Sequence, residues 1–216
     1  PKRLSVPIGA YSVAARGTAG GPSSLNITLG AGETRTLDLR KLLPTGMELF
    51  GPLARWTKKD NWLSRRGGGF MLYERERPLG RISFTLRVPH SRNPFSGGPK
   101  TRWVVNYVDR ANYVLIEVDE KNFQRSEVVD GRSRDVVRKP NVIPEDDQFA
   151  YISVSVRDEQ LVHQISRNGQ EWKVIDNWER GTAGRRPLGE GKFGFYMPGD
   201  DEIALSDFIF QPLTER

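Results

Sequence analysis

Apolar and polar residues alternate along much of this chain, which is the pattern of β-strands that bury one face. Residues 81–88 place apolar side chains at every second position, from Ile82 to Val88, and residues 150–157 repeat the pattern from Ile152 to Val156. No segment shows helical periodicity beyond two turns. The pattern therefore predicts an all-β protein whose core is built from these alternating positions.

Short polar segments separate the predicted strands and connect them as hairpins. Asp158-Glu159 precedes a strand over residues 161–165, and Asn168-Gly169 is a type I′ turn signal before residues 171–175. A last pair of strands, 192–197 and 203–210, flanks the turn 198–202. Strands this short at this spacing favour a sandwich or a barrel.

The first 45 residues differ in sequence pattern from the rest of the chain. Leu25–Leu29 and Thr34–Leu39 flank Gly30-Ala-Gly32, which predicts a short β-hairpin. Roughly forty residues form too small a core for independent folding. We therefore expect residues 1–45 to be a small β-segment, either the tail of a preceding domain or packed on a main domain of residues 46–216. Pro7-Ile-Gly-Ala10 with this hairpin resembles the small surface-layer modules called PEGA domains.

Composition limits the classes of function. The 216 residues carry a net charge of +6, and the absence of cysteine excludes disulfides and thiolate chemistry. No apolar run approaches the roughly 18 residues of a membrane span. The chain begins at Pro1 without Met and without an apolar leader, so we expect either a processed product or a fragment of a longer protein.

Arginine and lysine gather in a few short segments. Arg132, Arg134, Arg138 and Lys139 lie in one polar stretch, and Arg185-Arg186 lies among glycines. We expect solvated loops at both places. The alternative is an anionic partner, either nucleic acid or an acidic polysaccharide. Because positive charge is not concentrated in one stripe, no nucleic-acid partner is expected.

Residues 103–109 and 112–119 predict two neighbouring strands that carry aromatic and acidic side chains. Alternation places Trp103 and Tyr107 on one face of the first strand, and Tyr113, Glu117 and Asp119 on one face of the second. Aromatic rings of this kind form either the core or a flat surface on which sugar rings stack. The candidate ligand-binding residues are Trp103, Asn106, Tyr107, Asp109, Tyr113, Glu117, Asp119 and Arg87.

Several segments together resemble the concanavalin A-like lectin/glucanase superfamily, which includes laminin-G-like modules and 3-keto-disaccharide hydrolase-like proteins. The segments are Asn61-Trp-Leu, Gly67–Phe70, Gly80–Phe84, Trp103–Asp109, Asn112–Asp119, Gly191–Phe195 and Glu202–Phe210. The resemblance covers roughly residues 46–213 and implies a two-sheet antiparallel jelly-roll sandwich. It also implies that one curved sheet offers a face where such proteins often hold sugars.

The resemblance also allows a test for catalysis. Glucanases of this superfamily use Glu-x-Asp followed by a second Glu, and Glu117 and Asp119 match the first part. Lys121 and Asn122 occupy the positions of the second Glu. A retaining glycosidase needs two flanking carboxyl groups, so the signature is incomplete. Glu117 and Asp119 remain weak catalytic candidates, and ion pairs with Arg87 or Arg157 are the alternative role.

Other chemistry has little support in the sequence. His163 shares an apolar face with Leu161 and Ile165, which indicates a core position. Asp200, Asp201 and Glu202 are weak candidates for a calcium site, and no cofactor is otherwise expected.

The function that the sequence favours is a non-catalytic binding module for a carbohydrate, within a larger bacterial protein of the periplasm or cell surface. One alternative is a glycoside hydrolase or lyase relative that uses Glu117 and Asp119. The other is a structural or protein-interaction β-sandwich that binds a protein partner and no small ligand.

Overall fold

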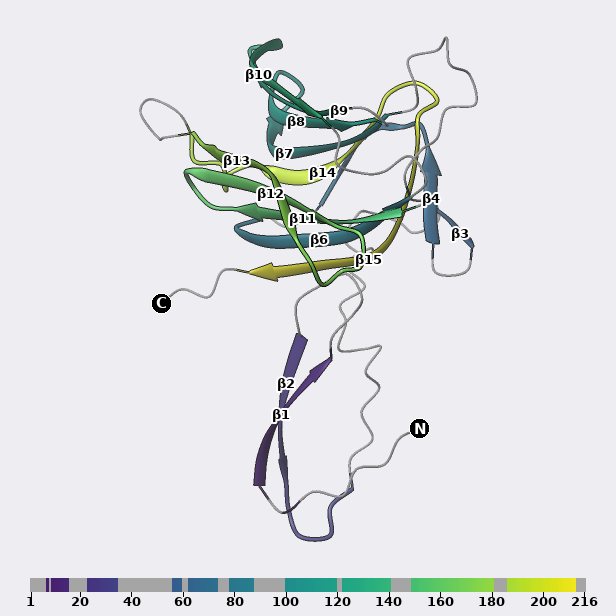
Figure 1. Ribbon diagram of the computed structural model, residues 1–216, viewed down its shortest axis with the longest axis vertical. Helices are drawn as coiled ribbons and strands as arrows, with labels where there is room; N and C mark the ends of the chain where they lie inside the picture. The colour runs from purple at the N-terminus through teal and green to yellow at the C-terminus, as the bar shows by residue number, and fades with distance from the viewer. Residues whose placement is uncertain are drawn as a thin grey trace.

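A computed structural model describes residues 7, 9–15, 23–34, 56–59, 62–73, 78–87, 100–119, 122–140, 149–180 and 186–212. These residues contain no helix and form three antiparallel sheets. The two larger sheets lie one above the other as a sandwich (Figure 1). A two-layer all-β architecture is what the alternating pattern predicted.

The first layer is a six-stranded sheet with the order β10-β9-β8-β7-β14-β5. Its strands are β5 (Gly69–Leu72), β7 (Thr101–Asp109), β8 (Asn112–Val118), β9 (Asn122–Val129), β10 (Arg132–Pro140) and β14 (Lys192–Met197). The second layer is a seven-stranded sheet with the order β13-β12-β11-β6-β15-β4-β3. Its strands are β3 (Thr57–Lys59), β4 (Trp62–Arg66), β6 (Gly80–Arg87), β11 (Phe149–Val156), β12 (Gln160–Ser166), β13 (Lys173–Glu179) and β15 (Glu202–Pro212).

The strand predictions over residues 81–88 and 150–157 are confirmed as β6 and β11. These strands pair with each other, and Phe84 lies opposite Ile152 in the core. Val88 lies outside the described residues. Ser153, expected on the solvent face, is buried because the Arg81 side chain crosses it, and Arg81 Nε donates to Ser153 Oγ at 2.7 Å.

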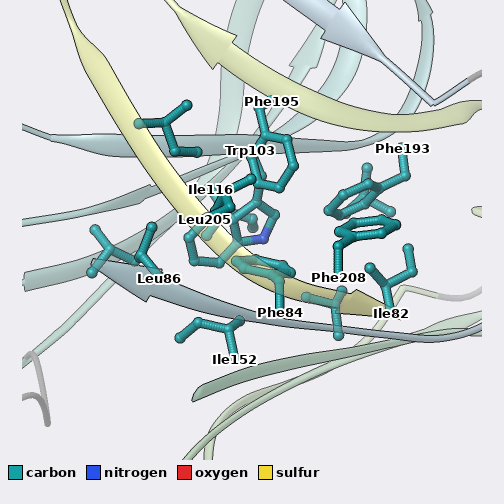
Figure 2. Packing of buried hydrophobic residues seen from close by; sticks show 14 of the residues in the cluster. Ile82, Phe84, Leu86, Trp103, Ile116, Ile152, Phe193, Phe195, Leu205 and Phe208 are labelled. Carbon is teal, nitrogen blue, oxygen red and sulfur yellow. The ribbon is translucent and has the colours of Figure 1, made fainter. Parts of the chain in front are cut away.

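Aromatic rings fill the space between the two sheets. Phe84 of β6 makes edge-to-face contacts with Trp103 of β7 and Phe195 of β14, with ring centroids 5.7 and 5.3 Å apart. Phe193 and Phe208 close the same cluster, as Figure 2 shows. Contacts of this geometry add to the stabilisation that burial provides. Because each sheet contributes rings, the cluster holds the two layers together.

His163 is a core residue, as its position among apolar residues predicted. It is 0% exposed, and its Nε2 accepts a hydrogen bond from Trp103 Nε1 at 3.1 Å. Burial lowers the pKa of His163 to about 3, against a weaker opposing effect of Asp176. A proton on Nε2 would face the indole N–H, so the imidazole must stay neutral for the contact to persist.

Buried charges connect the sheets at one side of the sandwich. Arg125 of β9 donates to Asp176 of β13 at 2.7 Å, and Lys139 of β10 donates to the other carboxylate oxygen at 2.6 Å. Burial by itself would raise the pKa of Asp176, but the hydrogen bonds and charges of Lys139 and Arg125 hold it below its ordinary value. The carboxylate therefore stays ionised between the layers.

The polar stretch around Arg132 to Lys139 is a strand and not the solvated loop expected from its composition. It forms β10, the edge of the six-stranded sheet, and pairs with β9. The expected loop at Arg185-Arg186 is only partly described, because Arg185 lies outside the described residues. An edge strand exposes most of its side chains, so charge is no evidence against a strand there.

The N-terminal region forms a separate two-stranded sheet of β1 (Gly9–Ala15) and β2 (Ser23–Leu29). The sequence paired Leu25–Leu29 with Thr34–Leu39, whereas the described partner of β2 is β1. Residues 35–39 and the proposed boundary at residues 45 and 46 lie outside the described residues. The division into two domains therefore stays a prediction. In the described part of the chain, no helix has the length and apolar character needed to cross a membrane.

Lowering the pH from 6.5 to 5 is expected to destabilise the fold through His163. The unfolded chain takes up a proton on this histidine near pH 6.5, whereas the folded chain resists it down to about pH 3. The free energy of unfolding should thus fall by about 1.4 kcal/mol per pH unit in this window. Urea denaturation measured at several pH values tests this. In His163→Gln, which keeps an acceptor for the indole, the slope should flatten, and an unchanged slope would contradict the assignment.

Candidate functional site

A β-bulge at Asn106 decides which side chains of β7 face outward. Asn106 has a φ of 53°, in the left-handed region that asparagine tolerates better than most residues. The pairing of β7 with β8 changes register between Val105 and Asp109. The pairing of β7 with β14 changes register between Val104, which faces Gly194, and Tyr107, which faces Lys192. Relative to β14 the bulge adds one residue between Val104 and Tyr107, which moves Tyr107 to the opposite face. Tyr107 therefore faces outward, although Trp103 and Val105 face the core.

Gly191 holds this bulge in place. Its backbone N–H donates to Asn106 Oδ1 at 2.9 Å in a buried position. A Cβ at residue 191 would lie 2.3 Å from the carbonyl carbon of Asn106, so only glycine fits. The side-chain oxygen of Asn106 accepts this backbone hydrogen bond and stabilises the bulge, so the role of Asn106 in the site is structural.

Four aromatic side chains gather on the outer face of the six-stranded sheet, and we call this group the aromatic platform. The Phe70 ring of β5 stacks on Tyr196 of β14 with centroids 4.2 Å apart, and it contacts Tyr107 and Tyr113 at 4.8 and 5.2 Å. All four rings are partly exposed. They come from four strands, β5, β14, β7 and β8, so the sheet itself fixes their arrangement.

A row of hydrogen-bonded polar side chains lies beside the platform on the same face. Arg102 of β7, Glu117 of β8 and Gln124 of β9 occupy directly opposite positions on neighbouring strands. Glu117 Oε1 accepts from Arg102 Nε at 2.8 Å and from Lys100 Nζ at 3.4 Å, and its Oε2 accepts from Gln124 Nε2 at 3.3 Å. The row continues to Arg138 of β10, whose Nη2 donates to Gln124 Oε1 at 2.9 Å.

Glu117 is thus the centre of an ion-pair network on the sheet face. The sequence suggested Arg87 or Arg157 as its partners, but the structure supplies Lys100 and Arg102. Arg102 also bonds Asp201. Asp201 lies in the turn between β14 and β15, which the sequence predicted to be a hairpin but which connects the two sheets. The Glu117 carboxylate is therefore fixed in position by three side-chain donors.

A cavity of about 550 Å³ opens at the end of the sandwich, next to the platform. It lies at the tips of the β7–β8 and β9–β10 hairpins, with Arg180 and Arg186 of the segments after β13 on its other side. Its lining residues are Asn106, Val108, Asp109, Asn112, Tyr113, Val114, Glu127, Val128, Val129, Asp130, Arg134, Arg180 and Arg186. Tyr113 belongs to both the cavity and the platform.

The two remaining acidic candidates stabilise turns. Asp109 Oδ1 accepts from Ala111 N at 2.7 Å and from Asn112 Nδ2 at 2.9 Å, and these bonds, with Arg186, lower the pKa of Asp109. Asp119 Oδ1 accepts from Asn122 N at 2.7 Å across the turn between β8 and β9. Both carboxylates close hairpins, and Asp109 does so at the wall of the cavity.

The sequence-predicted ligand residues therefore separate into groups. Tyr107, Tyr113 and Glu117 share the outer face, and Asn106, Asp109 and Tyr113 line the cavity. The expectation that Trp103 shares a face with Tyr107 is wrong, because the bulge lies between them. Trp103 is 1% exposed in the core, where no ligand can stack on it.

Arg87 and the proposed calcium ligands lie elsewhere. Arg87 is on β6 of the other sheet, with its guanidinium 4.7 Å from the centroid of the Trp62 ring. Asp200 pairs with Arg66 at 3.5 Å, and Asp201 bonds Arg102. Within the described ranges, no group of three or more His, Asp or Glu residues is arranged to hold a metal ion.

Sequence reasoning missed Phe70, Tyr196 and Arg102. In the predicted strand 192–197, Phe193 and Phe195 face inward, so alternation already placed Tyr196 outward. Strand order was the missing information. β14 pairs with β5 on one side and with β7 on the other, and this order brings Phe70 close to Tyr107.

Comparison with solved structures places this sandwich among jelly rolls. A prokaryotic β-1,3-1,4-glucanase (lichenase) derived from a mouse hindgut metagenome matches with a TM-score of 0.52 at 10% identity, over 74% of this chain and 84% of that chain. The GH43 protein BlXynB from Bacillus licheniformis matches with a TM-score of 0.50 at 12% identity, over 72% of this chain and 34% of its own. A GH43B protein of a xyloglucan PUL from Bacteroides ovatus matches with a TM-score of 0.50 at 15% identity, over 75% and 35%.

These matches agree with the two-sheet jelly-roll fold that the sequence predicted. The chain spans about a third of each of the two GH43 proteins. No protein-family model and no curated protein matches the chain in sequence. The matches therefore establish the fold alone, a jelly-roll sandwich.

Replacing Asn106 is expected to destabilise the fold in two separable steps. Asn106→Gly keeps the left-handed backbone but leaves Gly191 N–H without its acceptor, which costs about 1–3 kcal/mol. Asn106→Ala loses the same bond and also strains the backbone, so it should be about 1 kcal/mol less stable again. Urea denaturation of both variants measures the two steps. Equal stability of the two variants would show that the left-handed conformation at residue 106 costs nothing.

Proposed function

We propose that this protein is a non-catalytic module that binds a carbohydrate on the outer face of its six-stranded sheet. The observation that carries the proposal is the aromatic platform beside the polar row. Sugar rings present C–H groups on their faces and hydroxyls at their edges. A site for them needs flat apolar surface with a few fixed polar groups.

The platform meets the first requirement. Its four rings are partly exposed and packed against one another, with Phe70 in contact with the other three. Tyrosine combines an apolar ring with a polar hydroxyl, so it contacts both parts of a sugar. Because mutual packing fixes the rings before a ligand arrives, little side-chain entropy is lost on binding.

The polar row meets the second requirement. The ion pairs of Glu117 hold Arg102 and Lys100 on the sheet face, where Arg102 is 15% exposed and Glu117 17% exposed by side chain. Gln124 is fixed between Glu117 and Arg138. These groups offer donors and acceptors in set positions about one strand spacing apart, roughly 4.8 Å.

We place the module in a larger bacterial protein of the periplasm or cell surface, with glycan as its partner. The rival proposal of a structural or protein-interaction sandwich predicts a null result on any glycan array. It also predicts a stable self-associated or partner-bound state.

Truncating the platform is expected to weaken glycan binding with the fold intact. Tyr196→Ala and Tyr107→Ala each remove a stacking surface, and losses of tenfold or more in affinity are typical for aromatic residues at the centre of a binding surface. Titration calorimetry with glycans selected on an array measures the change. Tyr151→Ala is the matched control, because Tyr151 is a partly exposed tyrosine on the seven-stranded sheet.

Unchanged binding in both platform variants would remove the sheet face as the binding site. An equal loss in Tyr151→Ala would attribute the effect to stability instead. Thermal unfolding of all three variants separates these outcomes.

No hydrolysis or elimination of the bound glycan is expected. Glu117 accepts from three side chains, and Asp119 Oδ1 is occupied by the turn to Asn122. Incubation with the array-selected glycans, followed by chromatography for shorter products, checks this expectation. Product formed by the unaltered protein and abolished in Glu117→Gln would establish the glycosidase or lyase alternative.

A further inference from the structure

The cavity at the end of the sandwich differs in chemistry from the aromatic platform beside it. At about 550 Å³ it falls within the range of small-molecule sites, roughly 300–1,000 Å³. Its lining contains three arginines, Arg134, Arg180 and Arg186, and three acids, Asp109, Glu127 and Asp130. Formal charges balance, so the character of the cavity depends on which charges are already neutralised.

Arg180 and Glu127 neutralise each other. Arg180 donates from Nε and Nη2 to Glu127 Oε1 at 2.8 and 2.5 Å, and both side chains are buried. Arg180 also donates to the backbone oxygen of Arg186. This pair forms a fixed wall of the cavity and has no charge to offer a ligand.

Asp109 keeps its negative charge but is held in a turn by neutral donors. Its oxygens accept three hydrogen bonds from Ala111 N and Asn112 Nδ2 within the β7–β8 turn. Its negative charge draws Arg186 electrostatically, but the two side chains make no ion pair. The carboxylate is held in the turn, so it competes weakly for the guanidinium.

Among the described lining residues, Arg134 and Arg186 are the cations without an ion pair, and Asp109 and Asp130 are the acids without one. Both arginine side chains are exposed, and no carboxylate of the described residues lies within ion-pair distance of either. Arg134 lies opposite Glu127 on the neighbouring strand, but Glu127 is engaged by Arg180. Arg134 and Arg186 line the cavity from its two sides. Guanidinium groups suit a carboxylate, which they bind through paired N–H donors.

The rest of the lining suits the body of a sugar. Val108 and Val128 give apolar surface, and the Asp130 carboxylate, unbonded within the described part of the chain, can accept hydroxyl groups. Tyr113 connects the cavity to the platform. A glycan that lies across the platform can therefore place its end residue in the cavity.

We propose that this cavity binds a sugar carrying a carboxylate, a uronic-acid residue at the end of a glycan chain, through Arg134 and Arg186. The proposal rests on the proposed glycan-binding function and adds recognition of the negative charge on the terminal sugar. The platform supplies affinity for the chain, and the cavity selects acidic over neutral end residues.

The test uses the full 216-residue chain and pairs of glycans. Each pair consists of a uronic-acid-terminated oligosaccharide and the same molecule with its carboxyl reduced to a hydroxymethyl group. The acidic member should bind at least about tenfold more tightly at physiological salt. Arg134→Gln and Arg186→Gln should each reduce this ratio, and the double variant should abolish it. Arg132→Gln is the matched control, because Arg132 is exposed on the same strand but does not line the cavity.

The outcomes separate the two proposals. Equal affinity for the acidic and neutral members, or a preference that survives in the double variant, overturns the uronate assignment. If neutral glycans still bind and lose affinity in Tyr196→Ala, the glycan-binding function stands without it. Sulfated neutral glycans bound as tightly as uronates, or free sulfate that competes equally, would show a general anion site and also overturn the assignment. No binding to any glycan overturns both proposals.

Discussion

One interruption of the two-residue period in β7 determines the outer face of this sandwich. Up to Val105 the strand obeys alternation, and its inward side chains join the aromatic core. The bulge at Asn106 adds one residue relative to β14, so that Tyr107 faces outward. Without the bulge, Tyr107 would lie among the core rings and the platform would lack one of its four members. Gly191 makes the bulge possible because any Cβ there would collide with the Asn106 backbone.

Charge replaces apolar packing as β9 approaches the cavity. Its inward positions change from Phe123, which is fully buried, to Arg125 and then Glu127. Each finds a partner on or just after β13, in Asp176 and Arg180. Trp178 lies between them, with the guanidinium of Arg125 4.0 Å and that of Arg180 6.0 Å from its ring centroid. Buried ion pairs add little net stability, but leaving one charge unpaired is costly. Their consequence here is a fixed polar wall where the hydrophobic core ends.

Much of the fold could be predicted from the sequence because β6 and β11 keep strict alternation of apolar residues, and all the apolar positions from Ile82 to Leu86 and from Ile152 to Val156 are buried. Burial itself does not alternate, since Ser83, Thr85 and Ser153 are buried as well. Tyr113 and Glu117 were placed correctly on one face by the same alternation of residues. Trp103 was not, because a bulge leaves only an asparagine within an apolar run as its signal. Phe70 and Tyr196 could not be assigned to the site, since their proximity depends on strand order across the sheet, which local periodicity does not encode. β10 was missed because an edge strand needs no apolar face.

The platform and the cavity share a single structural origin. Tyr107 and Tyr113 lie on the two strands of one hairpin, and Asp109 and Asn112 close that hairpin at the cavity wall. Burial raises the pKa of Tyr113, with contributions from Tyr196, Tyr107 and Glu117, so its hydroxyl stays protonated as a donor between the two regions. Because the bulge at Asn106 sets both the direction of Tyr107 and the register of the hairpin tip, neither region can change without the other. A ligand that spans both would therefore meet a surface already formed before it binds.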